Sequence, residues 1–290
     1  MPDESVRPAW SEQFAAQAIQ RLVQSGPIAR LTPEWAFGGS TGKGVRVAVV
    51  DSGVEYDHPA VGDSVRGGVV VEYDEQAENS FRYEEENQPV DLAGHGTACA
   101  GIIHALAPQA EIYSVRVLGS NMGGRAIQFA GGLDWAIEHD IQVVNLSLST
   151  TLEEYFGLFH DLADQAYFKN MVVVCAANNY PEISYPSLYS SVISVAAHEG
   201  HDPFTYYYNP SPPVEFGAPG IDLDVAWNNK SYVNSTGNSF AAPHIAGIVA
   251  LIRSKHPELT PFQVKTILMT CASNMQRNPG PPQGRKTSRK

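Results

Sequence analysis

The sequence predicts an α/β fold in three layers, a mostly parallel sheet with helices on both faces. Two observations carry this prediction. Short runs rich in valine and isoleucine alternate with longer segments that have helical spacing. The short runs are apolar throughout, which is typical of parallel strands that are buried on both faces. Strands and helices that alternate in this way form one α/β domain.

Five runs are expected to be buried strands because they are short and dense in β-branched residues. They cover residues 45–50, 111–118, 142–148, 171–176 and 191–197. Three segments between them place apolar residues every three or four positions and are expected to be helices. These helices cover residues 97–106, 125–138 and 152–168. The main domain is expected to span residues 31–275.

The two ends of the chain differ from this domain. Residues 11–24 place Phe14, Ala18 and Leu22 on one side of a helix. We therefore expect residues 1–30 to form an extension that carries a short amphipathic helix. Residues 276–290 are proline-rich and basic and contain little that could be buried, so a disordered tail is expected.

Composition and charge exclude several classes of protein. Lys and Arg number 19 against 31 Asp and Glu, and the net charge of −12 argues against nucleic-acid binding and fits a basic peptide better. No apolar run approaches the roughly 18 residues of a membrane span, and the first thirty residues lack the pattern of a secretory signal. The odd number of cysteines, 3, favours a reduced protein, and a cytoplasmic location is expected.

Three segments carry residues of catalytic chemistry. Asp51 follows the first expected strand directly, and ligand and active sites of open α/β sheets form at such strand ends. An aspartate at this place could also bind a metal or a ribose or cap the next turn. His95 stands between two glycines at a helix start, where a lone histidine is structural about as often as functional. Ser239 begins a helix and could be its N-cap. Pro243 is expected in the first turn of that helix, where proline is tolerated.

Cys99 offers a second interpretation of the histidine segment. It follows His95 by four residues, and a catalytic thiol needs such a base nearby. The small and apolar residues around Cys99 favour helix packing over catalysis.

The order Asp, His, Ser and the residues around each resemble the subtilisin-like serine proteases, or subtilases. The signatures of that family read approximately Asp-Thr/Ser-Gly, His-Gly-Thr and Gly-Thr-Ser-Met-Ala-x-Pro-His. The likeness extends from about residue 31 to residue 272. The matching segments here are Asp51-Ser52-Gly53, His95-Gly96-Thr97 and Gly237-Asn238-Ser239-Phe240-Ala241-Ala242-Pro243-His244.

The resemblance assigns roles to these residues. His95 would take the proton of Ser239 as its hydroxyl attacks a peptide carbonyl, and Asp51 would orient the histidine. The asparagine after the strand at 171–176 would donate a hydrogen bond to the oxyanion, and by counting this is Asn179. Asn178 stands where the family usually has glycine, and it is either the alternative donor or a turn residue.

The resemblance also implies how substrate binds. An extended peptide would add a strand between Ser147, Leu148 and Ser149 on one side and the segment that begins at Gly119 on the other. Ser149 and Thr150 replace glycines of many relatives, so we expect a narrowed or reshaped pocket for the residue before the cleaved bond.

No metal or other cofactor is expected. Many subtilases bind calcium with a loop inserted after the catalytic histidine and an aspartate shortly after the catalytic one. Here residues 102–108 run into the next strand without an insertion, and Ala60 replaces that aspartate. Calcium needs six to eight oxygen ligands.

The resulting prediction is a serine endopeptidase that hydrolyses extended peptides or unfolded proteins through an acyl-enzyme. Only 50 residues precede Asp51, so an intracellular peptide- or leader-processing role is expected rather than that of an exported relative with a long propeptide. Two other classes stay open. One is a transpeptidase or macrocyclase that passes the same acyl group to an amine, and the other is an inactive peptide-binding relative.

Residues 72–86 carry seven acidic residues against Arg82 alone. We expect an acidic loop beside the cleft. It either keeps the protein soluble or attracts basic peptides.

Overall fold

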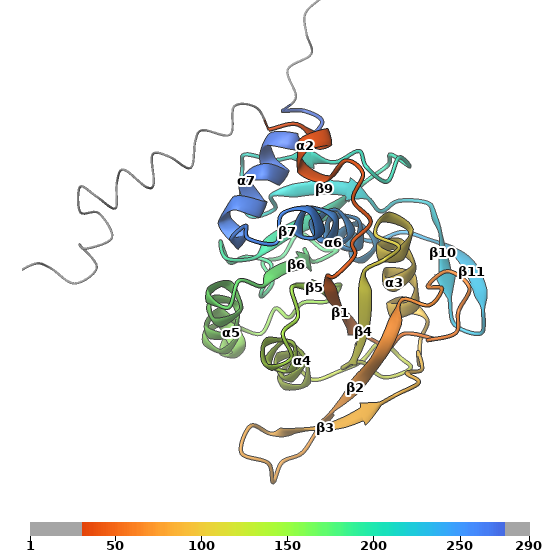
Figure 1. The fold of residues 1–290 in the computed structure, drawn as a ribbon. Helices are drawn as coiled ribbons and strands as arrows, with labels where there is room; N and C mark the ends of the chain where they lie inside the picture. Colours follow the sequence, from red (N-terminus) through yellow and green to blue (C-terminus); the bar gives the residue numbers. More distant parts are fainter. Residues whose placement is uncertain (1–30, 276–290) are drawn as a thin grey trace, which may run out of the picture.

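The computed structural model describes residues 31–275 and confirms the three-layer α/β fold (Figure 1). Its main sheet has nine strands in the order β3-β2-β4-β1-β5-β6-β7-β9-β8. The strands are β1 (Arg46–Asp51), β2 (Val65–Tyr73), β3 (Phe81–Glu86), β4 (Glu111–Arg116), β5 (Val143–Leu146), β6 (Val172–Ala176), β7 (Ile193–His198), β8 (Tyr207–Tyr208) and β9 (Phe216–Pro219).

The sheet is parallel from β2 through β9, and its two edge strands, β3 and β8, run antiparallel to their neighbours. The first strand, β1, lies in the middle between β4 and β5. The chain therefore builds one side of the sheet before it crosses to the other. Such a reversal of strand order opens a crevice at the carboxyl ends of the strands, and Asp51 is the last residue of β1.

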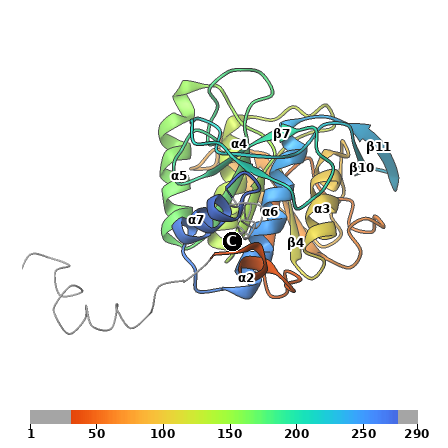
Figure 2. The same cartoon turned by 90° about the horizontal axis from the view of Figure 1, so that it is seen from above.

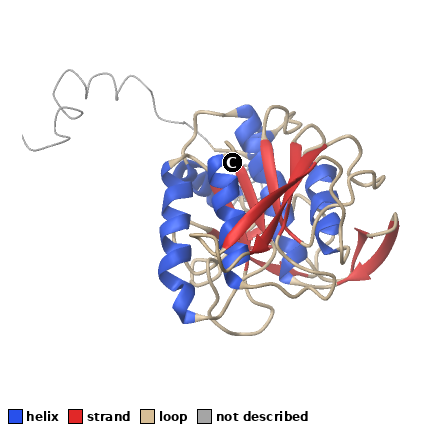
Figure 3. Ribbon diagram, turned by 90° about the horizontal axis from the view of Figure 1, so that it is seen from below, coloured by secondary structure: helices blue, strands red, loops and turns tan. Residues whose placement is uncertain are grey.

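Helices cover both faces of the sheet, as expected. One face carries α4 (Ala126–Glu138) and α5 (Phe156–Phe168), which follows a short 3₁₀ turn, η2 (Glu153–Tyr155). The other face carries α3, α6, α2 and α7. Figure 2 shows α4 and α5 together on one side of the molecule and α3 on the opposite side, and Figure 3 shows helices on both sides of the strands. The bounds on the second face are α3 (His95–Leu106), α6 (Asn238–Lys255), α2 (Pro33–Phe37) and α7 (Pro261–Cys271).

The strand β1 explains why the predicted strands are apolar without alternation. Val47 and Val49 belong to the core under α3 and α6, whereas Ala48 and Val50 belong to the core under α4 and α5. Successive side chains of a strand point to opposite faces, so a strand between two helical layers must be apolar at every position.

The acidic segment 72–86 is a hairpin and not a loop, which corrects the prediction. β2 and β3 pair antiparallel, with Tyr73 opposite Phe81, and only residues 74–80 form the turn. Phe81 packs against the core, and the Tyr83 hydroxyl lies 2.9 Å from Asp134 Oδ2. The aromatic residues anchor the strand, so most of its acids stand along the edge of the sheet.

A second, two-stranded sheet of β10 (Leu223–Trp227) and β11 (Ser231–Ser235) packs against α3 (Figure 1). The expected helix at residues 11–24 and the expected disordered tail at 276–290 lie outside the described residues. Within residues 31–275, no helix combines the length and apolar character needed to cross a membrane.

Candidate active site

Asp51 is the anchor of the site. It is completely buried at the carboxyl end of β1, and its Oδ1 accepts a hydrogen bond of 2.7 Å from the backbone N–H of Ser52. Burial of a carboxylate is unfavourable unless it is paired or hydrogen-bonded. The structure supplies that pairing through His95.

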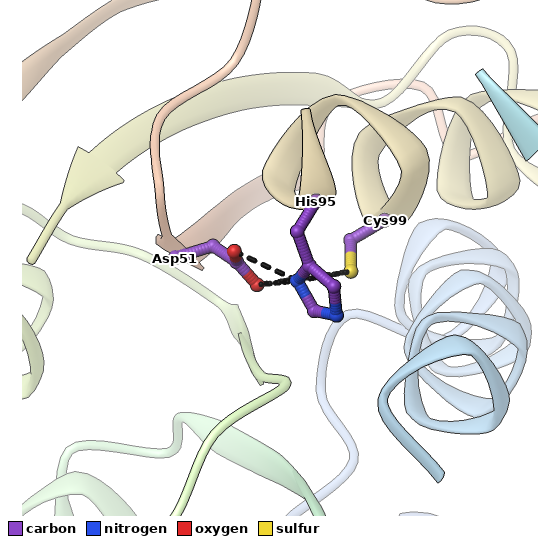
Figure 4. Close-up of side chains that lie close together, drawn as sticks. All are labelled: Asp51, His95 and Cys99. Carbon is purple, nitrogen blue, oxygen red and sulfur yellow. Dashed lines mark hydrogen bonds and ion pairs between the residues drawn. The ribbon is translucent and has the colours of Figure 1, made fainter. Parts of the chain in front are cut away.

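His95 is the first residue of α3, and its Nδ1 lies 2.8 and 2.9 Å from the two carboxylate oxygens of Asp51 (Figure 4). The helix can begin here because Gly94 adopts φ of 106°, a left-handed conformation that favours glycine. A side chain at this position would also meet the Trp227 ring at 2.6 Å. The chain turn before His95 is therefore fixed by both backbone conformation and packing.

The charge of Asp51 controls the proton affinity of the histidine. Burial alone would lower the pKa of His95, but the adjacent Asp51 carboxylate holds this pKa well above its ordinary value. The same contact leaves His95 Nε2 free to face the third residue of the motif.

Ser239 is the second residue of α6, and its Oγ lies 2.8 Å from His95 Nε2. The structure thus joins Asp51, His95 and Ser239 in one hydrogen-bonded chain, although they come from three distant segments. This arrangement can transfer the hydroxyl proton to the imidazole while Asp51 holds the ring.

Pro243 is not in the first turn of α6, which corrects the prediction. The helix begins at Asn238, so Pro243 lies in the second turn, and the Ser239 carbonyl loses its helical partner because proline has no N–H. Ser147 Oγ donates to this carbonyl at 2.8 Å, and Cys99 Sγ lies 3.5 Å from it. The proline therefore makes the backbone of Ser239 depend on two side chains, one directly after β5 and one in α3.

Cys99 packs beneath the histidine, as its surroundings predict. Its side chain is completely buried, with Sγ 3.3 Å from Ser147 Oγ. Asp51, His95 and Cys99 form the group of three metal-ligand side chains found among residues 31–275 (Figure 4). Burial raises the pKa of the Cys99 thiol, and thiolate is the form that binds metal. The Asp51 contact also occupies His95 Nδ1, so these residues suit proton transfer better than metal binding.

The Asn179 side chain contacts the start of α6. Its Oδ1 accepts a hydrogen bond of 2.9 Å from the backbone N–H of Asn238, the residue before Ser239. This contact directs the other end of the amide, which carries N–H donors, away from Asn238. Asn178 also lies in the cleft lining described below, and its Oδ1 accepts from the Tyr180 backbone at 3.0 Å, which closes a turn.

A cleft of about 380 Å³ opens beside Ser239 and Asn179. Ser147, Leu148 and Ser149, the residues predicted to bind substrate, are among its lining residues. Gly119 does not line it. Gly123 and Gly124 of the same segment do, while Gly119 lies in a neighbouring hollow with Leu92 and Arg116.

Other lining residues were not found by sequence reasoning. Phe129 lies on the buried side of α4, and its position in the helical pattern predicts only that it packs in the core. Leu152 is the first residue of the expected helix 152–168 and has no motif around it. Arg125, the charged residue of the cleft lining, stacks over the Tyr73 ring with 4.0 Å between the guanidinium carbon and the ring centre.

The residues do not fit the calcium site of the family. The His58 ring is almost fully buried, with Nε2 3.1 Å from the Ser231 carbonyl and Nδ1 accepting from the Ala60 backbone. Ala60 offers no carboxylate, and α3 runs unbroken from His95 to Leu106. An apolar residue thus stands where calcium would need a carboxylate oxygen.

A sequence profile described as the Subtilase family matches residues 42–285. The chain belongs to this family. The order and contacts of Asp51, His95 and Ser239 in this subtilase agree with the resemblance drawn from its motifs.

Several relatives show the same likeness. Subtilisin E of Bacillus subtilis (strain 168) is 34% identical over 255 residues, which cover 81% of this chain and 62% of subtilisin E. Minor extracellular protease Epr of the same strain is 33% identical over 240 residues, or 78% of this chain and 35% of Epr. This subtilase therefore spans less than two thirds of either protein. Subtilisin of Bacillus pumilus is 33% identical, with 81% of this chain and 86% of that one covered.

Solved structures agree with the fold. The S41 psychrophilic protease superposes with a TM-score of 0.67 at 26% identity, over 82% of this chain and 88% of that chain. A cold adapted subtilisin-like serine proteinase superposes with a TM-score of 0.65 at 25% identity, over 80% and 83%.

Proposed function

We propose that this subtilase is a serine endopeptidase that cleaves extended peptides through an acyl-enzyme. The observation that carries the proposal is the continuous hydrogen-bonded chain from Asp51 through His95 to Ser239 Oγ, with 2.8 Å at each His95 contact to its nearest partner. A serine hydroxyl is a weak nucleophile at neutral pH, and a base in contact with it removes that limitation.

The reaction would run in two halves. Ser239 Oγ attacks the substrate carbonyl carbon while His95 Nε2 takes the hydroxyl proton. His95 then gives this proton to the departing amine as the C–N bond breaks, which leaves an ester on Ser239. In the second half, water attacks the ester carbon while His95 takes one of its protons. The bond between that carbon and Ser239 Oγ then breaks, His95 returns the proton to Oγ, and the carboxylic acid leaves.

The negative oxygen formed in each half needs hydrogen-bond donors. The Ser239 backbone N–H lies in the first turn of α6, where N–H groups have no partner within the helix. The Asn179 side chain would be the second donor. Fixed donors of this kind stabilise charge that develops only in the transition state.

Peptide recognition would use the cleft between the two segments that line it. The backbone at residues 123–125 and 147–149 borders the space, and an extended chain can pair with such segments as an added strand. Because a backbone pairs in this way only when it is unfolded, flexible peptides and unfolded proteins are the proposed substrates.

A preference for basic substrates is a further part of the proposal, and it depends on the hairpin. The turn at 74–80 follows the carboxyl end of β2, which points to the same edge of the sheet as Asp51. Arg125 at the cleft opposes this preference with a positive charge. The balance between the turn acids and Arg125 decides which charge the site attracts.

We also propose that the protein processes peptides or leaders in the cytoplasm. Support comes from Cys99, Cys175 and Cys271, which are all free and buried in the reduced form. Fractionation of native cells tests this, since recovery of the protein in the cytoplasmic fraction is expected and recovery outside the cell would refute it.

Product analysis tests the proposed reaction. A flexible peptide is incubated with the protein, and with a Ser239→Ala variant as the control, and the products are identified by mass spectrometry. Two fragments whose masses sum to the peptide plus one water are expected. A cyclised or ligated product would identify the protein as a transpeptidase or macrocyclase. An unchanged peptide would identify it as an inactive peptide-binding relative.

A further inference from the structure

Asp91 is an acidic residue outside the three motifs, and its carboxylate accepts five hydrogen bonds. It lies in the loop before α3, four residues ahead of His95. Oδ1 accepts from Ser52 Oγ at 2.8 Å and from the backbone N–H groups of Ala93 at 3.0 Å and Gly94 at 2.7 Å. Oδ2 accepts from the backbone N–H and the hydroxyl of Thr97, each at 2.7 Å.

These five donors belong to two segments of the proposed triad. Ser52 directly follows Asp51, whereas Ala93, Gly94 and Thr97 surround His95. The bridge is reinforced on the Ser52 side, because Ser52 Oγ accepts from the Gly96 backbone at 3.1 Å while donating to Asp91. One carboxylate therefore connects the segment that carries the buried acid with the segment that carries the imidazole.

The two segments approach closely where both carry glycine. A side chain at Gly96 would meet the Gly53 carbonyl oxygen at 1.9 Å, and one at Gly53 would meet the Val90 carbonyl oxygen at 2.1 Å. Glycines allow this close approach but do not hold it. Two other hydrogen bonds join the segments, from the Leu92 N–H to the Ser52 carbonyl at 3.1 Å and from the Glu55 N–H to Thr97 Oγ1 at 2.9 Å. Asp91 adds to them by binding Ser52 and Thr97 with one carboxylate.

We infer that Asp91 is a positioning residue for the triad, which sets the distance and tilt between the Asp51 carboxylate and the His95 ring. The inference rests on the proposed function. His95 Nδ1 lies nearly equidistant from the two oxygens of Asp51, and a shift of α3 relative to β1 would change both contacts together. Small misplacements of a catalytic group reduce rate strongly even when the variant residue never touches substrate.

A simpler role would be that of a helix cap, because acidic residues before a helix accept bonds from its first N–H groups. Capping explains the bonds from Gly94 and Thr97. It does not explain the bond from Ser52, which belongs to the other segment. Ser52→Ala therefore separates the two roles, since it removes the Ser52 bond to Asp91, together with the Gly96 bond to Ser52, and leaves the four bonds from Ala93, Gly94 and Thr97 to Asp91.

The test is Asp91→Asn, which keeps the size of the side chain but replaces one acceptor oxygen by a donor. We expect kcat to fall roughly 10- to 100-fold while KM changes less than about twofold, because the cleft is not altered. Asp202→Asn is the matched control. Asp202 also accepts from a backbone N–H, that of Phe204, and from a threonine hydroxyl, that of Thr205, and it does not line the cleft.

A second readout follows the triad directly and needs no turnover. The low-field proton resonance of His95 Nδ1–H, recorded by NMR in a Ser239→Ala background, reports its contact with Asp51. We expect this resonance to shift or broaden in Asp91→Asn and in Ser52→Ala and to stay unchanged in Asp202→Asn. The acidic limb of the pH profile of kcat/KM should move in the same two variants.

Two results would overturn the inference. One is a lower melting temperature in Asp91→Asn with the resonance and the kcat per folded molecule unchanged, which would leave Asp91 as a cap. The other is a Ser52→Ala variant whose resonance and kcat both equal those of the parent protein. Ser52→Ala is also the decisive variant if Asp91→Asn does not fold. Failure of the proposed function is a different result, because the wild-type protein would then cleave no peptide while the resonance still reports whether Asp91 holds the ring.

Discussion

The carboxylates around the proposed triad and those of Glu84 and Glu85 in the β2–β3 hairpin are chemically alike, but their surroundings are opposite. Asp51 is completely buried and Asp91 accepts five hydrogen bonds. Glu84 and Glu85 are exposed, and within residues 31–275 their carboxylates make no ion pair. A bonded carboxylate fixes geometry, whereas an exposed one acts only through screened charge. The comparison teaches that the hydrogen bonds a carboxylate accepts decide its effect on the site. The number of acidic residues beside it does not.

Loss of the nucleophile should give the largest effect. Ser239→Ala removes the attacking oxygen and leaves the buried contacts of α6 in place, so we expect kcat to fall roughly 10⁶-fold, the loss known for subtilisin itself, with the melting temperature nearly unchanged. His95→Ala should be nearly as damaging, because the triad acts as a unit. Turnover of a fluorogenic peptide, with thermal unfolding as the folding control, checks both variants. A Ser239→Ala protein that retains full turnover would place the nucleophile elsewhere.

Asp51→Asn tests the buried carboxylate that contacts His95. We expect kcat to fall roughly 10⁴-fold because the amide favours the wrong histidine tautomer. The Asp51 charge raises the pKa of His95, so its removal lowers that pKa. His95 accepts a proton only when it is neutral, above its pKa, and the acidic limb of kcat/KM should therefore move to lower pH. A limb that stays in place would show that another group titrates there.

The oxyanion donor ranks next. Asn179→Ala should lower kcat roughly 100- to 1,000-fold with little change in KM, as expected for a contact made mainly in the transition state. Asn178→Ala is the matched control, since Asn178 closes a turn through the Tyr180 backbone, and it should change kcat only slightly. The reverse ranking of the two variants in steady-state kinetics would assign the donor to Asn178.

These variants also mark what the sequence could predict. The layers and the main strands follow from apolar runs, and Asp51, His95 and Ser239 follow from motifs, because periodicity and local signatures are properties of short segments. The role of Asp91 could not be predicted, since its donors at Ser52 and Thr97 become neighbours only when β1 and α3 pack together. The partners of the Ser239 carbonyl, Ser147 and Cys99, depend in the same way on folding.

The hairpin shows the opposite kind of error. A run of acids indicates solvent and suggests a loop, but Phe81 and Tyr83 at alternating positions anchor residues 81–86 as a strand. The core that receives Phe81 is built from segments far away in the chain. Composition alone therefore gave too much weight to charge and too little to two aromatic residues.

The exposed acids should have a small effect that depends on position. Replacement of Asp74, Glu75 and Glu78 in the turn by their amides should raise KM for substrates with Lys or Arg near the cut roughly two- to fivefold, with kcat for neutral substrates unchanged. The control is Glu84→Gln with Glu85→Gln, because β3 carries these residues away from the edge where Asp51 lies. Glu86 is left intact because it pairs with Arg116 at 2.5 Å. Added salt should reproduce the effect of the turn variant. Equal KM changes for basic and neutral peptides would reduce the turn to a solvated loop.

The smallest expected effect is that of a calcium chelator. Ala60 replaces the carboxylate and α3 runs unbroken, so thermal unfolding with and without chelator should give nearly the same melting temperature. A drop of many degrees that added calcium reverses would reveal a site built from other residues.

Covalent labelling of Ser239 tests the central claim most directly. A fluorophosphonate probe reacts with a serine whose hydroxyl is activated by a neighbouring base. We expect intact-protein mass spectrometry to show one added probe group per wild-type molecule, peptide mapping to place it on Ser239, and the Ser239→Ala and His95→Ala variants to remain unlabelled. A probe group on another residue, or labelling that persists in Ser239→Ala, would contradict the triad of Asp51, His95 and Ser239.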